Sequence, residues 1–252
     1  MLQNFSHKFI EKKMWLALAL PVWVLGSFIL VQALLIFGIQ ALQWLGVSFA
    51  GINPIILNTA AGAIIYVLTI AMVIGLPWLV KKYKTTRAEL GIDRPVHWVD
   101  FLLAPAGFIA YIIISGTLVA LAGLFLHFID LDQVQDTGFN GLSQSYEYVL
   151  AFLTLVVVAP VAEEVLFRGY LLGKLRQHVS VWLSILITSA LFGLVHFAWN
   201  VGIDVFALSI VLCLLRVYTK RLWPSIMLHM LKNGLAFYIL FINPTFLSTL
   251  GG

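Results

Sequence analysis

Long apolar runs dominate this chain of 252 residues, and they restrict it to folds that suit a lipid bilayer. No acidic or basic residue occurs between Met14 and Leu57, and further apolar runs follow as far as Ile242. A helix needs about 20 such residues to cross a bilayer. Only 10% of the residues are charged, whereas about a quarter are charged in a typical soluble domain. The chain is therefore predicted to be an all-α, polytopic transmembrane bundle, and soluble, secreted, disordered and nucleic-acid-binding proteins are excluded.

The lengths of the apolar runs predict seven spans, and a second short or re-entrant helix around Gln40–Gly51 would make eight. The seven are Met14–Ile39, Ile55–Val80, Phe101–Phe128, Tyr148–Leu172, Val181–Asn200, Ile203–Tyr218 and Leu222–Ile242. The expected organisation is a cytoplasmic segment at 1–13, N-terminal spans at 14–147 with a basic loop at 81–100, a core at 148–243 and a tail at 244–252.

The basic residues predict the orientation of these spans. With seven spans, all the Lys and Arg residues of the connecting segments fall on one side: Lys8, Lys12, Lys13, Lys81, Lys82, Lys84, Arg87, Arg94, Lys174, Arg176, Arg216, Lys220 and Arg221. The loop between the third and fourth spans, on the other side, holds Asp130, Asp132, Asp136 and Glu147. Because cytoplasmic loops are enriched in Lys and Arg, we expect a cytoplasmic N-terminus, an uncleaved first span and an external C-terminus.

The basic loop contains the signal of one short helix. Thr86-Arg87-Ala88-Glu89 fits a capping box, and Gly91 is placed to end the helical turn. This motif predicts a structural feature and no chemistry.

Ionisable side chains cluster inside the predicted spans of the second half. Such residues are costly at membrane depth, so they mark functional sites by default. We expect them to contact one another because unpaired polar groups in lipid cost free energy. They are Glu163, Glu164 and Arg168 in the fourth span, His196 in the fifth, and His229, Lys232 and Asn233 in the last.

Helix spacing separates the two glutamates. Glu164 and Arg168 are four residues apart, so they share a helix face and can form an ion pair. Glu163 points about 100° away around the helix. A carboxylate beside another carboxylate and an arginine is suited to act as a general base. Glu163 is therefore the candidate base, and the Glu164–Arg168 pair is interpreted first as a structural clamp.

Two more pairs have the same four-residue spacing. His229 and Asn233 place two donors on one face of the last span, which suits the oxyanion of a tetrahedral intermediate. Phe192 and His196 place an apolar ring below an imidazole on the fifth span. Taken alone, either histidine is more typical of an interhelical hydrogen bond. Lys232 is interpreted as a side chain that snorkels toward the cytoplasmic interface.

Three motifs, at Glu163-Glu164-Val165-Leu166-Phe167-Arg168-Gly169, Phe192-Gly193-Leu194-Val195-His196 and His229-Met230-Leu231-Lys232-Asn233, resemble those of one family. This is the CPBP family, the CAAX proteases and bacteriocin-processing enzymes, also called Abi proteins. The resemblance extends from about Tyr148 to Tyr238. Leu90-Gly91-Ile92 is similar to a short cytoplasmic element that often precedes the family's core.

The resemblance implies an intramembrane endopeptidase of the glutamate type, similar to the enzyme that removes the last three residues of prenylated CAAX proteins. It implies that Glu163 and His196 activate water and that His229 and Asn233 stabilise the oxyanion. Glu164 and Arg168 would shape the site, with Phe192 in support. We expect no cofactor and no metal. The expected partners are the lipid bilayer and a membrane-associated or lipidated protein or peptide, which reaches a cavity that opens toward the cytoplasm.

Three alternatives remain open at this point. Glu163, His196 and His229 offer a ligand set for zinc, although the chain contains no His-Glu-x-x-His pattern. A transporter or channel would use the same charges as an ion path. A non-proteolytic scaffold or immunity protein would keep the fold without the reaction.

Overall fold

The computed structural model describes residues 2–127, 130–131, 137–139 and 141–245, with side chains from Trp15 onward. The described part is helical and contains no strand, which confirms the predicted all-α class. Some segments are π-helical and carry the label η. The elements are α1 (Leu2–Trp44), α2 (Pro54–Ile70), η1 (Ala71–Gly75), α3 (Leu76–Lys81), α4 (Arg87–Leu90), α5 (Trp98–Phe125), α6 (Ser145–Phe152), η2 (Leu153–Val158), α7 (Ala159–Glu164), η3 (Val165–Leu171), α8 (Leu172–Leu175), α9 (Val181–Leu194), α10 (Trp199–Thr219), α11 (Trp223–Phe237) and η4 (Tyr238–Ile242).

Six helical stretches of the described part are long and apolar enough to cross a membrane: Trp15–Trp44, Pro54–Lys81, Trp98–Phe125, Ser145–Leu175, Trp199–Thr219 and Trp223–Ile242. A seventh apolar helix, α9, is shorter. The predicted fifth span, Val181–Asn200, was therefore too long, because the chain leaves the helix after Leu194. The alternative eighth helix around Gln40–Gly51 is wrong: α1 continues to Trp44, and residues 45–53, all of them described, form a turn and a loop.

Parts of the predicted topology fall outside this description. The backbone of the N-terminal segment is helical and continuous with the first span, since α1 begins at Leu2. The side chains of Lys8, Lys12 and Lys13 lie outside the described residues, as do Phe128, Asp132, Asp136 and the tail from residue 246.

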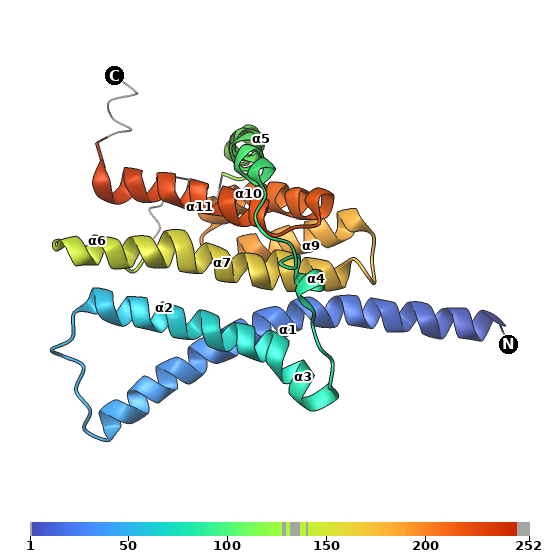
Figure 1. The fold of residues 1–252 in the computed structure, drawn as a ribbon, viewed down its shortest axis with the longest axis horizontal. Coiled ribbons are helices and arrows are strands. Elements are labelled where there is room, and N and C mark those ends of the chain that lie inside the picture. The colour runs from blue at the N-terminus through green and yellow to red at the C-terminus, as the bar shows by residue number, and fades with distance from the viewer. Residues whose placement is uncertain (1, 128–129, 132–136, 140, 246–252) are drawn as a thin grey trace.

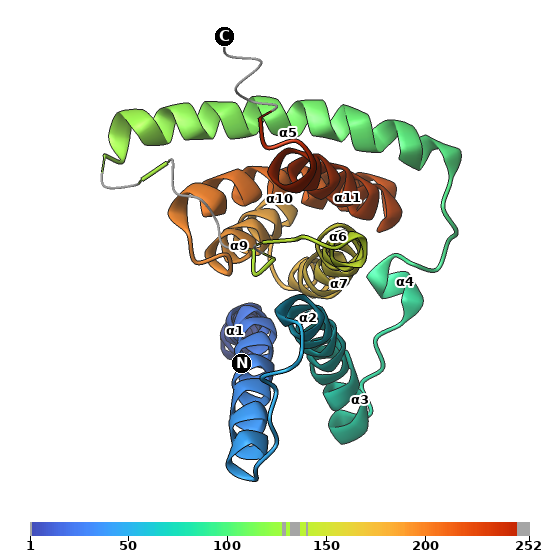
Figure 2. The same cartoon turned by 90° about the vertical axis from the view of Figure 1, so that its left-hand side faces the viewer.

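The helices form layers, with α5 on one outer side, α10 and α11 beneath it, then α6–α8 and α9, and α1–α3 on the other side (Figures 1 and 2). Figure 1 views α5 end-on and Figure 2 shows it lengthwise, so α5 lies across the helices that it covers. It contacts both α10 and α11. These layers place α6–α8, which carry both glutamates, in the interior of the bundle.

Small residues allow close helix crossings in the core. A Cβ atom on Gly193 would lie 2.8 Å from the carbonyl oxygen of Gly202, where α9 and α10 meet. A Cβ on Gly107 would lie 2.9 Å from the Leu228 side chain, where α5 meets α11. Larger residues at these positions would have to displace a backbone or a packed side chain. The crossing at Gly193 also fixes the short link that carries His196.

The predicted capping box in the basic loop is confirmed. Thr86 Oγ1 accepts from the Glu89 backbone N–H at 3.2 Å, and Glu89 Oε2 accepts from the Thr86 backbone N–H at 2.8 Å. Gly91, at φ 77°, ends the turn in the left-handed region. Leu90 is buried in the main apolar cluster of the core, and Arg216 donates to the Glu89 carbonyl at 2.9 Å. The loop is therefore fixed to the core by specific contacts.

Candidate functional site

The two adjacent glutamates have different environments. Glu164 is fully buried, and its Oε1 accepts from Arg168 Nη1 at 2.8 Å and from His229 Nδ1 at 2.9 Å. Glu163 lines a cavity, and its side chain is 18% exposed. The ion pair predicted from the four-residue spacing is present, even though π-helical η3 begins directly after Glu164. Of the two, only Glu163 is placed to meet a molecule that enters the cavity.

Phe192 lies at the centre of this polar group. Its ring is fully buried, and the Arg168 guanidinium lies 4.3 Å from the ring centroid. The rings of His196 and His229 make edge contacts with it at centroid distances of 5.1 and 5.7 Å. Phe192 thus stabilises the buried cation through its ring face and separates the two imidazoles at a fixed distance.

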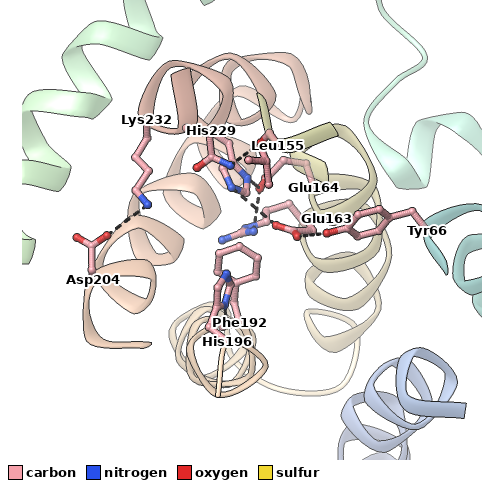
Figure 3. Close-up of polar contacts among 11 residues, drawn as sticks. Tyr66, Leu155, Glu163, Glu164, Phe192, His196, Asp204, His229 and Lys232 are labelled. Atoms are coloured by element: carbon pink, nitrogen blue, oxygen red, sulfur yellow. Dashed lines mark hydrogen bonds and ion pairs between the residues drawn. The ribbon is translucent and has the colours of Figure 1, made fainter. Parts of the chain in front are cut away.

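Glu163 is held by a hydrogen bond from another layer of the bundle. Tyr66, on α2, donates its hydroxyl to Glu163 Oε1 at 2.5 Å, and Glu163 Oε2 lies 3.8 Å from His229 Nε2 (Figure 3). Helix spacing separated Glu163 from the Glu164–Arg168 pair but did not predict the contact with Tyr66. The phenol fixes one carboxylate oxygen and leaves the other directed toward the imidazole.

The sequence predicted that His196 lies on a helix, and this prediction was wrong. His196 follows the end of α9, and Phe197 takes a left-handed backbone conformation at φ 53° before α10 begins. His196 Nδ1 lies 2.7 Å from the Phe192 carbonyl oxygen. A carbonyl accepts only, so this contact assigns the proton to Nδ1 and leaves Nε2 as an acceptor in the neutral ring.

Asn233 lines the same cavity, and π-helical geometry supplies its partner. Its Nδ2 donates to the Leu155 carbonyl at 2.9 Å, and Leu155 lies inside η2. A π-helical turn interrupts the regular helical bonding, which frees a carbonyl to accept from a side chain. An amide carries two N–H groups, so Asn233 is oriented by one and keeps the other for a ligand.

Lys232 does not snorkel to an interface, which corrects the interpretation from sequence. Its ammonium lies 3.5 Å from Asp204 Oδ2 on α10, and the other Asp204 oxygen accepts from Tyr111 and Ser115, each at 2.6 Å. Lys232 lines the cavity beside His229 (Figure 3). The pair therefore lies within the bundle and next to the candidate site.

The cavity that joins these residues has a volume of about 350 Å³ and receives lining from α1, α2, the η2–η3 stretch and the α9–η4 stretch. Its polar lining comprises Tyr66, Thr137, Glu163, His196, His229, Lys232 and Asn233. Thr137 belongs to the loop before α6. The opening of the cavity toward the cytoplasm stays a prediction.

The part of the chain that carries the candidate residues is similar to known proteins. Residues 145–235 match the family described as "Type II CAAX prenyl endopeptidase Rce1-like". The membrane-embedded CAAX protease MroQ of Staphylococcus aureus is 29% identical over 94 residues, which are 35% of this chain and 38% of that protein. YdiL of Bacillus subtilis is 30% identical over 84 residues, which are 33% of this chain and 34% of that protein. This similarity agrees with the resemblance of the three motifs to the CPBP family. The chain thus matches little more than a third of the length of these relatives, and no solved structure shows a significant match.

The matched region brings together all the candidate residues from the sequence. Within the described residues, no group of three or more His, Cys, Asp or Glu side chains is placed to hold a metal ion. Both histidines use Nδ1 for a partner in the protein, so Nε2 is the nitrogen that each of them presents to a ligand. Because zinc-bound histidines also have such partners, the zinc alternative is tested by the chelator experiment below.

Sequence reasoning missed two residues that contact the candidate residues of this site. Asp204 is the one acidic residue of α10, and its position inside a predicted span was a signal that could have found it. Tyr66 gave a weaker signal, since a tyrosine within an apolar run is usually a core or interface residue. The pairing of Tyr66 with a residue 97 positions later depends on tertiary packing.

Proposed function

We propose that this protein is a membrane-embedded endopeptidase of the glutamate type, which hydrolyses a peptide bond in a membrane-associated or lipidated protein or peptide. One observation carries the proposal: of two adjacent glutamates, one is fully buried and neutralised, and the other lines a cavity with two histidines and an asparagine. Arg168 neutralises Glu164, which leaves Glu163 to react.

Water activation is assigned to Glu163 and His196. Glu163 Oε1 is occupied by Tyr66, so Oε2 is the oxygen that takes a proton from water. His196 presents Nε2 as an acceptor because its Nδ1 donates to the Phe192 carbonyl. An acceptor on the neutral imidazole can hold the second hydrogen of the same water and so orient its lone pair toward a carbonyl carbon.

Oxyanion stabilisation is assigned to His229 and Asn233. Glu164 accepts from His229 Nδ1, so Nε2 is a donor only when the ring is an imidazolium. The Glu164 and Glu163 carboxylates lie 2.9 and 3.8 Å from the two ring nitrogens. The free N–H of Asn233 is the second donor. Two donors aimed at developing negative charge supply the main stabilisation in acyl transfer.

The reaction balances with these groups alone. Glu163 Oε2 takes a proton from water, and the hydroxide bonds to the carbonyl carbon to form a tetrahedral oxyanion beside His229 and Asn233. When the C–N bond breaks, Glu163 returns the proton to the leaving nitrogen. The products are a carboxylic acid and an amine, which become a carboxylate and an ammonium when a proton passes between them, and Glu163 is again ionised.

The walls of the site favour an apolar substrate. A second hollow of about 850 Å³, lined almost wholly by apolar side chains of α1, α5, α9 and α10, adjoins the first and shares Leu25 and Val195 with it. An acyl or prenyl chain, or an apolar peptide segment, would lose water-exposed surface on binding there. We assign the protein to the cell membrane with a cytoplasmic N-terminus, and the catalytic domain to residues 148–243.

The deciding experiment measures hydrolysis of fluorogenic membrane peptides, prenylated and unprenylated, by the detergent-purified protein. Glu163→Gln keeps the shape of the side chain and removes the base, and we expect the rate to fall by about 10²–10⁴-fold. Glu89→Gln, a glutamate of the basic loop outside the cavity, is the matched control and should retain the wild-type rate. Activity should persist in a strong zinc chelator.

Two results would contradict the proposal. Equal rates of hydrolysis by the wild-type protein and Glu163→Gln would show that Glu163 is not the base. A folded wild-type protein that cleaves none of the peptides, in detergent or in proteoliposomes, would favour a scaffold or immunity protein. Orientation is tested separately with a membrane-impermeant maleimide on Lys84→Cys in right-side-out and inverted vesicles, because the native Cys213 is buried and gives little background labelling.

A further inference from the structure

Lys232 has unused hydrogen-bonding capacity inside the cavity. In the part of the chain that the structure describes, its one polar partner is Asp204, at 3.5 Å. Charge-assisted hydrogen bonds between nitrogen and oxygen are about 2.7–2.9 Å long, so this contact is an ion pair without a full hydrogen bond. An ammonium has three N–H donors. The Lys232 ammonium, in a largely apolar cavity, can therefore donate hydrogen bonds to a further acceptor.

Asp204 is already satisfied without Lys232. Its Oδ1 accepts from the hydroxyls of Tyr111 and Ser115, both on α5, at 2.6 Å each. These bonds fix the carboxylate in place and stabilise part of its negative charge. Asp204 therefore holds the ammonium in position and neutralises it only partly. The Lys232 side chain is 20% exposed, so a ligand in the cavity can reach it.

The place of Lys232 relative to the reacting groups defines what it can bind. Lys232 follows His229 by three residues on α11, so the two side chains emerge about 5–6 Å apart on neighbouring positions of one face. An extended peptide advances about 3.3 Å per residue. A peptide with its reacting carbonyl at His229 and Asn233 would thus bring groups a few residues away next to the ammonium.

We propose that Lys232, positioned by Asp204, forms an anion-binding subsite of the cavity that takes a carboxylate of the peptide substrate. The carboxylate is either a free carboxyl terminus or an Asp or Glu side chain close to the cleaved bond. This subsite extends the proposed hydrolysis and rests on it for its role, although the binding of a carboxylate is measurable without any reaction. Its function is to select substrates and to set the register of the peptide.

The test measures binding by fluorescence anisotropy in detergent, with three short apolar peptides that differ in one group. One ends in a free carboxylate, one ends in a carboxamide, and one ends in a carboxamide but carries an internal glutamate. Wild-type protein should bind one of the two carboxylate peptides about tenfold more tightly than the neutral one, as expected for one hydrogen-bonded charge pair. The peptide that gains identifies the source of the carboxylate.

Variants assign this preference to Lys232. Lys232→Met keeps the apolar stem and should bind all three peptides equally, while Lys232→Arg should keep the preference. Lys84→Met, at an exposed lysine of the basic loop, is the matched control. The double variant Lys232→Met/Asp204→Leu removes both charges, so it tests the same loss of preference without an unpaired carboxylate.

The outcomes separate this subsite from the hydrolysis. Equal affinity of the wild-type protein for all three peptides, including no binding of any, overturns the subsite. A preference that survives in both Lys232→Met and Lys232→Met/Asp204→Leu overturns it as well. A Lys232-dependent preference without hydrolysis keeps the subsite and refutes the peptidase. Hydrolysis that depends on Glu163 and ignores the carboxylate refutes the subsite alone.

Discussion

The N-terminal spans and the later spans bury their side chains to different extents. In α1, α2–α3 and α5, between 11% and 17% of the most apolar stretch is buried, against 28% to 44% in α6–α8, α10 and α11. The buried ion pair, His229 and Asn233 belong to the later spans, and His196 belongs to the link between α9 and α10. The earlier spans contribute mainly apolar walls, together with the hydroxyls of Tyr66, Tyr111 and Ser115.

This difference separates the spans that carry most of the proposed reacting groups from the spans that surround them. In the core, Glu164 pairs with Arg168 and His229, and Asn233 donates to the Leu155 carbonyl, so a substitution there should affect folding and activity together. In the N-terminal spans, a substitution should change the orientation of a reacting group and leave the fold intact. Variants of the two regions can therefore break or sharpen the distinction.

The largest effect is expected at the buried ion pair of the core. Glu164→Leu leaves the Arg168 guanidinium buried and uncompensated, and we expect a loss of about 3–5 kcal/mol in the free energy of unfolding. Denaturant-induced unfolding in detergent, followed by tryptophan fluorescence, measures this loss. The double variant Glu164→Leu/Arg168→Met removes both charges and should regain most of the stability. A single variant as stable as wild type would show that the core tolerates an unpaired charge.

A smaller effect is expected where α9 crosses α10. In Gly193→Ala the new Cβ would lie 2.8 Å from the Gly202 carbonyl oxygen, so the helices must separate. We expect a destabilisation of about 1–3 kcal/mol and, because His196 follows directly, reduced activity. Gly116→Ala on α5 is the matched control, since a Cβ there meets nothing within 4 Å. Equal thermal stability of the two variants would refute the close crossing.

Tyr66 tests the assigned role of the N-terminal spans. Tyr66→Phe removes only the hydroxyl that donates to Glu163 Oε1, and we expect kcat to fall about tenfold while KM and thermal stability change little. Tyr218→Phe, at an exposed tyrosine at the end of α10, should behave as wild type. A Tyr66→Phe protein with wild-type kcat would confine the chemistry to the later spans. Loss of stability instead of kcat would make Tyr66 a packing residue.

Local spacing predicted the parts of the site that lie within one helix. The Glu164–Arg168 pair and the Thr86–Glu89 capping box depend on contacts three or four residues apart, which helix geometry alone determines. The hydropathy of the chain likewise predicted the all-α class, because the length of an apolar run sets the length of a span.

The sequence did not predict the contacts between distant segments. The partner of Glu163 comes from α2, and the partner of Lys232 comes from α10, so both depend on how whole helices pack. The early end of α9 was missed because the apolar pattern continues through Val195 and Phe197 although the helix does not. Hydrophobic periodicity does not reveal a link between two helices when the residues of the link are apolar.

The smallest effect is expected at the junction of the two regions, where α4 docks on the core. Burial alone would raise the pKa of Glu89, but hydrogen bonds from Lys174 Nζ at 2.9 Å and from the Thr86 backbone hold that pKa below its ordinary value. A lowered folded-state pKa means that ionised Glu89 stabilises the fold. Its contribution is complete above the unfolded-state pKa of about 4.3 and is lost as the pH falls through the folded-state value.

Glu89→Gln measures the strength of this junction. The Glu89 side chain is 33% exposed, so solvent screens the pair and its contribution should be about 0.5 kcal/mol. Thermal unfolding in detergent should therefore show a slightly less stable variant at pH 7 and a smaller difference at an acid pH, below about 4. A gap of the same size at both pH values would assign the effect to the capping geometry, and the N-terminal spans would then be joined to the core by packing and backbone contacts rather than by charge.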